Sequence, residues 1–171
     1  MKSILFLIPS ILATASCAEY GKARRVDYNG PAALVSDSAK VHSNSKVDYF
    51  YVEKLDGESI ANNRTDSLRM NQGRGFFMQP ASRVREVPAR SVSLEIAGRT
   101  EYAAPILTLA NKVYEVKGKL EFKPVVRERY VVTGQLGEGY SAVWVENEKS
   151  RKVVGRKVEI HGDASLGFFR K

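Results

Sequence analysis

Apolar and polar side chains alternate with a period of two along much of this chain. The stretch 112–123 shows this most clearly, because uncharged residues fall on one face and charged residues on the other. The first face holds Tyr114, Val116, Gly118, Leu120 and Phe122, and the second holds Glu115, Lys117, Lys119, Glu121 and Lys123. Such alternation is typical of a β-strand with one face on a core and one in water.

Shorter runs of the same kind predict further strands. They lie at 31–35, 49–52, 92–96, 130–136, 142–145, 153–154 and 158–160. Turn-forming residues separate them, as in Asp56-Gly57, Lys123-Pro124 and Gly137-Glu138-Gly139. We therefore expect an all-β fold: a single antiparallel β-sandwich of six to eight short strands with little helix, or a barrel of the same strands.

The segment 58–90 departs from this pattern. It is rich in Asn, Gly and Arg and contains Pro80 and Pro88. Residues 67–70 could form one helical turn, and residues 76–78 a strand. A connection of this length is uncommon in a compact domain unless it has a role, so we expect functional residues here. Irregular structure at a sheet edge is the alternative.

The N-terminus has the pattern of a secretory signal peptide over residues 1–16. A lysine at position 2 precedes the apolar run 4–12, which is too short to cross a bilayer as a helix. Residues 13–17, Ala-Thr-Ala-Ser-Cys, resemble the lipobox of bacterial lipoproteins, although Thr14 stands where that motif usually has Leu. This predicts lipidation of Cys17, and Ala18 favours the outer membrane. Ordinary signal cleavage, which would leave a free periplasmic or secreted protein, is the alternative.

These signals divide the chain into four parts. After the signal peptide, residues 17–30 are small, polar or basic and are expected to form a lipid-anchored flexible tether. Residues 31–162 then form the β-sandwich domain, and residues 163–171 form a C-terminal tail. Cys17 is the sole cysteine, so the fold depends on its core without an internal disulfide.

The charge balance suggests an anionic partner. The chain has 27 Lys and Arg against 19 Asp and Glu, a net charge of +8. For an exported protein, anionic polysaccharide or lipopolysaccharide fits this surface better than nucleic acid, which we do not expect as a partner. The alternative is a solvated basic surface that binds no ligand and only aids solubility. The candidate contacts are Arg69, Arg74, Arg83, Arg85, Arg151, Lys152, Arg156 and Lys157.

The tail adds a second candidate surface. Phe168 and Phe169 stand beside Arg170 and Lys171, a pairing that suits contact with a membrane surface. The same aromatics could instead add a last strand or cover a hydrophobic edge.

No catalytic or metal-binding constellation is visible in the sequence. His42 and His161 are isolated and lack the spacing of metal ligands. Ser141 lacks the second glycine of a nucleophile elbow, and Gly73–Gly75 precedes no helix that could hold a phosphate. We therefore predict a protein that is not an enzyme and that needs no cofactor or metal.

The chain as a whole resembles the small uncharacterised envelope lipoproteins of Gram-negative bacteria. The resemblance rests on the signal with Cys17, on Leu55-Asp56-Gly57, on 130–134 (Tyr-Val-Val-Thr-Gly) and on 143–147 (Val-Trp-Val-Glu-Asn). It implies an immunoglobulin-like or transthyretin-like sandwich at the periplasmic side of the outer membrane. The resemblance implies no active site. The β-sandwich with its irregular arginine-rich loop predicts a non-enzymatic module that binds an envelope protein or an anionic glycan or lipid.

Two other functions stay open from the sequence. One is a secreted or periplasmic enzyme whose site is assembled only in three dimensions. The other is a structural accessory of a secretion or surface machine.

Overall fold

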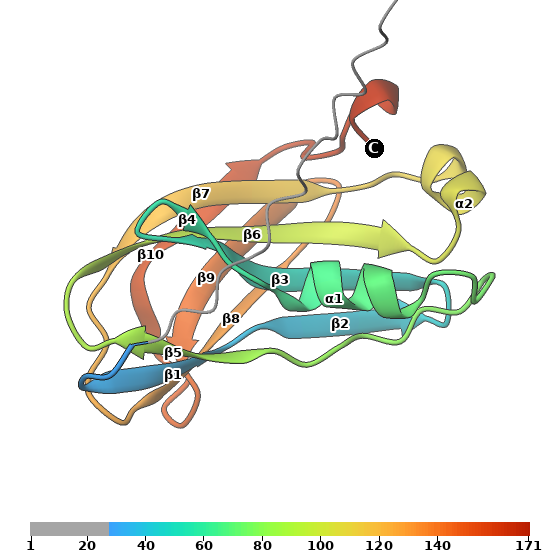
Figure 1. Ribbon diagram of the computed structural model, residues 1–171. Helices are drawn as coiled ribbons and strands as arrows, with labels where there is room; N and C mark the ends of the chain where they lie inside the picture. Colours follow the sequence, from blue (N-terminus) through green and yellow to red (C-terminus); the bar gives the residue numbers. More distant parts are fainter. Residues whose placement is uncertain (1–27) are drawn as a thin grey trace, which may run out of the picture.

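Two β-sheets stacked face to face form most of the computed structural model, which describes residues 28–171 (Figure 1). The expected all-β sandwich is confirmed. The signal peptide, Cys17 and residues 17–27 of the expected tether lie outside the described residues. Among residues 28–171, no helix has the length and hydrophobicity needed to cross a membrane.

Sheet A has the strand order β10-β9-β8-β1-β5. Its strands are β1 (Ala32–Ser36), β5 (Val84–Pro88), β8 (Arg129–Gln135), β9 (Tyr140–Asn147) and β10 (Val153–His161). The neighbours pair antiparallel except for β1 and β8, which run parallel with Leu34 beside Arg129.

Sheet B is antiparallel throughout and has the order β2-β3-β6-β7, with β4 paired to β3. Its strands are β2 (Ser38–Ser43), β3 (Lys46–Leu55), β4 (Glu58–Ser59), β6 (Val92–Tyr102) and β7 (Glu115–Phe122). The chain passes from sheet A to sheet B at Asp37, the residue between β1 and β2.

The core between the sheets consists of the apolar residues that the period-two pattern singles out. Leu94 and Ile96 of β6 and Val132 of β8 are fully buried there. Phe50 of β3 is buried as well and packs against Gly134, where an added Cβ would lie 2.2 Å from the Ala142 carbonyl oxygen. The alternation thus predicts the inner faces of the strands.

The strand count is higher than the predicted six to eight, because residues 28–171 form ten strands. The additional pairing involves β2, β4 and β5, whose sequences lack clear alternation. Two helices complete the fold, α1 (Asn63–Met70) and α2 (Pro105–Ala110), with a 3₁₀ turn, η1, at Phe168–Arg170. The expected turn at 67–70 is the second half of α1.

Residues 76–78 form no strand, contrary to the sequence-based expectation. The Phe77 amide donates to the Arg74 carbonyl in a turn, and the Met78 amide donates to the Asn44 carbonyl in the β2–β3 connection. Only Met78 of the three side chains is buried. The apolar run is therefore divided between one residue that packs inward and two that face solvent.

The tail returns to sheet B just ahead of β7. Ser165 forms an isolated antiparallel bridge with Tyr114, and the Leu166 amide donates to the Val113 carbonyl over 2.8 Å. Ala164 and Leu166 are buried by this contact. Residues 168–171 then lie near α2 at one end of the sandwich (Figure 1).

Candidate functional site: a pocket between α1 and α2

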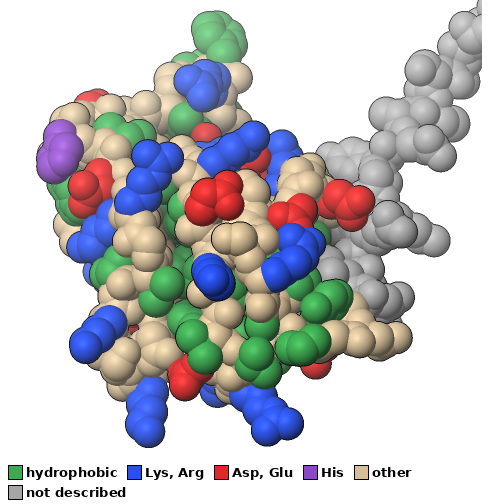
Figure 2. Space-filling view, turned by 90° about the vertical axis from the view of Figure 1, so that its left-hand side faces the viewer, with side chains coloured by type: hydrophobic (Ala, Val, Ile, Leu, Met, Phe, Trp, Pro, Cys, Tyr) green, Lys and Arg blue, Asp and Glu red, His purple; other side chains and the backbone are tan. Residues whose placement is uncertain are grey.

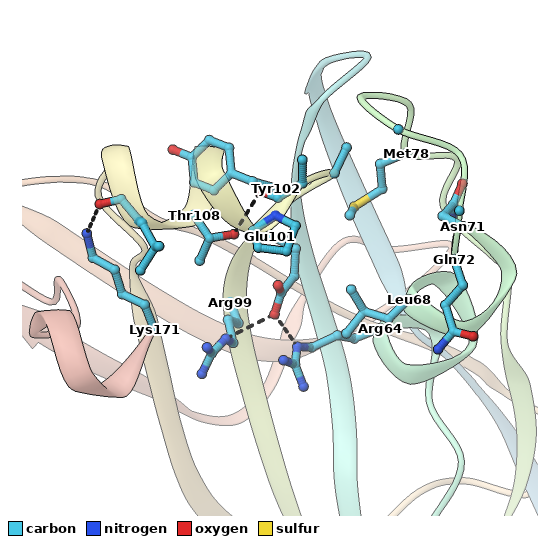
Figure 3. Close-up of a pocket in the computed structure, with 16 residues that line it drawn as sticks. Arg64, Leu68, Asn71, Gln72, Met78, Arg99, Glu101, Tyr102, Thr108 and Lys171 are labelled. Carbon is cyan, nitrogen blue, oxygen red and sulfur yellow. Dashed lines mark hydrogen bonds and ion pairs between the residues drawn. The ribbon is translucent and has the colours of Figure 1, made fainter.

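Residues 60–83, here called the covering segment, lie over the outer face of sheet B. Tyr49 and Tyr51 of β3 point to that face and are buried beneath the segment together with Met78. At the end of the sandwich that carries α2, the covering segment and α2 leave a cavity of about 740 Å³ between them (Figure 3). We call this cavity the α1–α2 pocket.

Polar contacts, more than apolar ones, fix α1 beside the pocket. Asn62 caps the helix by accepting from the Thr65 amide over 3.0 Å. The Asp37 carboxylate accepts from the backbone amide of Asn63, the first residue of α1, over 2.9 Å. On the inner side of the helix, the buried Ser67 hydroxyl accepts from the Ala81 amide over 2.7 Å. The first and last parts of the covering segment are thereby joined.

Asn71 braces the loop that follows α1 and borders the pocket. Its side-chain amide donates to the Ser67 carbonyl over 2.7 Å and to the Gln79 carbonyl over 2.8 Å. Its oxygen accepts from the Gln79 amide over 2.9 Å. One buried side chain therefore closes the loop 71–79 at its base.

Two arginines and a glutamate form the charged floor of the pocket. Glu101 on β6 accepts from Arg64 Nε of α1 over 2.5 Å and lies 3.0 Å from Arg99 Nε (Figure 3). Arg99 also donates to Glu115 of β7 over 2.6 Å. Burial acts to lower the pKa of Arg64, but Glu101 and other neighbours outweigh this and raise it. Arg64 therefore stays a cation despite being half-buried.

Tyr51 lies under this floor and keeps its proton. Burial raises its pKa to about 12, with Arg64 opposing and Glu53 adding to the shift. Tyr51 is thus a neutral phenol beneath the charged floor.

The walls of the pocket are mostly apolar. Leu68 of α1 and Met78 face Tyr102 across the cavity (Figure 3), and Leu109 of α2 also lines it. Lys171 reaches the same rim and donates to the Leu109 and Asn111 carbonyls over 3.3 and 2.7 Å. Among the described residues that line the pocket, three are cations and Glu101 is the one carboxylate. The arrangement suits a ligand with an apolar part and a negative group.

The candidate contacts from the covering segment and β5 differ in availability. Arg85 is 10% exposed and bonds both oxygens of Asp37, so its donors are used inside the fold. Arg83 and Arg69 both bond Asp66. Arg74 is exposed on the loop beside the pocket, and among the described residues no acid pairs with it.

The other four candidates lie around β9 and β10, on sheet A. Arg151 bonds Glu146 over 2.9 Å, and Lys157 lies 4.3 Å from the centre of the Trp144 ring. Arg156 donates to the Lys119 carbonyl, while Lys152 is exposed. The structure therefore does not bring the eight candidates together. At the end of the molecule opposite α2, basic side chains are likewise interspersed with acidic and apolar ones (Figure 2).

Sequence reasoning missed Arg99 and Glu101 as pocket residues. Arg99 and Glu101 occupy the alternate positions of β6 that point away from the core, so the sequence pattern predicts that they face solvent. Nothing in the alternation shows that a distant segment covers that face.

The two histidines do not form a metal site with their neighbours. His42 pairs with Asp48 over 2.7 Å, and the His161 ring packs on Tyr140. Within residues 28–171, no group of three or more His, Cys, Asp or Glu side chains is placed to hold a metal ion.

Comparisons with known proteins give no relative for this chain. No protein-family model, no curated protein and no solved structure matches it.

Proposed function

We propose that this protein is a non-enzymatic binding module of the bacterial cell envelope, anchored by lipid on Cys17, whose α1–α2 pocket holds an anionic amphiphile. The observation that carries the proposal is the composition of the pocket. Arg64, Arg99 and Lys171 stand against the single Glu101, between walls of Leu68, Met78 and Leu109. Clefts of this volume with few placed polar groups are typical of small-molecule sites.

The charged floor supports binding over catalysis. Glu101 accepts from Arg64 Nε and forms an ion pair with Arg99, so its carboxylate is engaged by two permanent cations and not by a group that exchanges protons, as general acid–base chemistry needs. Arg64 is bonded to Glu101 through Nε (Figure 3), and its terminal nitrogens have no hydrogen-bond partner among the described residues. A phosphate or carboxylate could accept from these nitrogens in a charge-assisted pair.

The envelope location rests on the N-terminal sequence and needs its own test. Intact mass of the protein from a membrane fraction is expected to show a chain beginning at Cys17 with added acyl mass. The Cys17→Ser variant should lack that mass. An unmodified wild-type chain would contradict the anchored location and leave the pocket proposal untouched.

Binding is tested with dodecyl phosphate, and dodecyl maltoside serves as the uncharged probe with the same chain. We expect dodecyl phosphate to raise the melting temperature, because a ligand that binds only the folded state stabilises it by roughly 3 kcal/mol at a hundredfold excess over Kd. Arg64→Met should abolish most of this rise, since it removes the free guanidinium nitrogens.

Arg83→Met is the matched control, because Arg83 lies on the same segment and bonds Asp66 outside the pocket lining. It should keep the response to dodecyl phosphate. Equal responses of the wild type to both probes, or equal losses in both variants, would contradict the proposed site.

A further inference from the structure

Large apolar side chains from three separate segments are exposed at the end of the sandwich that carries α2. We call this set the aromatic end: Phe76, Phe77, Ile106, Phe168 and Phe169. Phe169 is 98% exposed, and Phe77 and Ile106 are each 62% exposed. The loop after α1, α2 and the tail all lie toward this end in Figure 1. Large exposed apolar side chains gathered toward one end of a molecule are candidates for an interaction surface.

The three segments that form the aromatic end carry cationic but no acidic side chains. Residues 69–77, 105–112 and 168–171 contain five cations and no Asp or Glu. Two of the cations have acid partners outside these ranges, since Arg69 bonds Asp66 and Lys112 bonds Glu138. Arg74 and Arg170 have none among the described residues, and Lys171 bonds carbonyl oxygens only.

Aromatic side chains beside unpaired cations match the chemistry of an anionic bilayer surface. The rings enter the region between headgroups and acyl chains, and the cations stay at the level of the phosphates. A protein partner would need a complementary acidic face of defined shape, whereas a bilayer accommodates three short, separate segments.

The length of the chain before the described residues allows this orientation. Eleven peptide units link Cys17 to Tyr28, which can span at most about 36–40 Å when extended. Strand β6, with eleven residues, measures about 36 Å and runs nearly the length of the sandwich. Because β1 begins at the opposite end, the fully extended tether matches the length of β6, and the orientation requires it to run along the sandwich toward the aromatic end.

We propose that the aromatic end docks onto an anionic lipid bilayer and turns the mouth of the α1–α2 pocket toward the lipid headgroups. Gly75, Pro105 and Lys171 belong to the pocket lining and lie within two residues of docking residues in the chain. A ligand could then enter the pocket from the membrane without crossing water. The part of the proposal that concerns ligand entry rests on the proposed function, and the docking itself does not.

Site-specific tryptophan fluorescence tests the docking in the full chain. The native Trp144 is replaced by Phe, and a single tryptophan is introduced by Phe169→Trp or, as the control at a distant turn, by Val125→Trp. Val125 is 62% exposed, as solvent-accessible as Phe168. The protein is reconstituted with vesicles of phosphatidylethanolamine and phosphatidylglycerol that carry brominated acyl chains.

We expect bromine to quench the tryptophan at 169 severalfold more than the one at 125. Replacing Arg74 and Arg170 by Glu in the same chain should weaken the quenching at 169 by about tenfold or more at low salt, and uncharged phosphatidylcholine vesicles should quench it little. Equal quenching at both positions, or none at 169, would overturn the proposal.

A blue-shifted emission at 169 that grows with protein concentration in the absence of vesicles would mean a second copy covers this end, and it would also overturn the proposal. The readout is independent of the pocket, since Phe169, Arg74 and Arg170 are not among its lining residues. Failure of docking and failure of dodecyl phosphate binding are therefore separate results.

Discussion

The two faces of β3 are buried by different means. On the inner face, Phe50 and Val52 pack into an apolar core shared by both sheets. On the outer face, Tyr49 and Tyr51 lie under a covering segment whose backbone is held largely by side-chain hydrogen bonds. The first arrangement needs no particular bond direction, since hydrophobic burial is non-directional. The second needs each donor to meet its acceptor, and an unmade buried hydrogen bond is costly.

This contrast explains where the candidate site lies. A pocket needs rigid walls around a space that no side chain fills. The covering segment, which hydrogen bonds hold in place, provides such walls. The inner core, in which Phe50 packs against Gly134, has no space for a ligand. Function in this molecule is therefore expected on the outer face of sheet B.

Arg85→Ala is expected to lower the free energy of unfolding most, because it disturbs the hydrogen bonds that hold the covering segment on the outer face of β3. It leaves the fully buried Asp37 carboxylate without its bidentate partner. We expect a loss of about 3–5 kcal/mol in the free energy of unfolding, measured by urea denaturation. Arg90→Ala, which breaks the exposed pair with Asp56, is the control and should cost less than about 1 kcal/mol. Similar costs for both would refute the structural role of Asp37.

Leu94→Ala probes the apolar side. Leu94 is fully buried between the sheets, and its truncation should cost about 2–5 kcal/mol in the same measurement. Val125→Ala on the exposed turn should stay within about 0.5 kcal/mol. A small effect at Leu94 would mean that the apolar core is looser than the buried side chains indicate.

Tyr51→Phe tests the burial of the outer face of β3 through the pH dependence of the free energy of unfolding. Burial raises the folded-state pKa of Tyr51 from 10.0 to about 12, so the unfolded chain loses this proton first as the pH rises. The stability linked to Tyr51 is complete below pH 10 and declines between the two pKa values, by about 2–3 kcal/mol in total. The Phe variant should lose correspondingly less stability over that range. Parallel curves for both proteins would contradict the burial of the phenol.

Asn71→Ala is the mildest change and the most local. It removes three hydrogen bonds at the base of the loop 71–79, at a cost of about 1–3 kcal/mol. Amide exchange should accelerate in that loop while β6 and β8 keep their protection. Gln72→Ala, on the exposed side of the same loop, should leave exchange unchanged. Faster exchange throughout the protein would show that the loop and the sandwich open together.

The inner face was predictable because it obeys one local rule. Val116, Leu120 and Phe122 occupy alternate positions, and all three are buried. The same rule placed the charged residues Lys117 and Lys119 outward. It says nothing about β2, β4 and β5, which complete the sheets by pairing with strands that do alternate.

The candidate site was harder to predict, because its residues meet through tertiary contacts. The segment 58–90 stood out in the sequence as the region where functional residues were expected, and it supplies Arg64, Leu68 and Met78 to the pocket. Yet Arg85 is a cation on the same segment that the fold uses internally. Arg85 differs from the pocket residue Arg64 because it meets Asp37, which lies 48 residues earlier in the chain. The local sequence does not show this contact.

The parallel pairing of β1 with β8 has a consequence for how the chain folds. Among the described strands it joins the β1–β5 pair to the β8–β10 meander within sheet A, and it brings residue 34 beside residue 129. Closing so long a loop is slow, and proteins dominated by such distant pairings fold in about milliseconds to seconds. Sheet B can form from β2 to β7 before this closure, with the apolar side chains of Phe50 and Leu94 still facing water. The last event is then the docking of one sheet on the other, and a chain held at that stage is the form most exposed to aggregation.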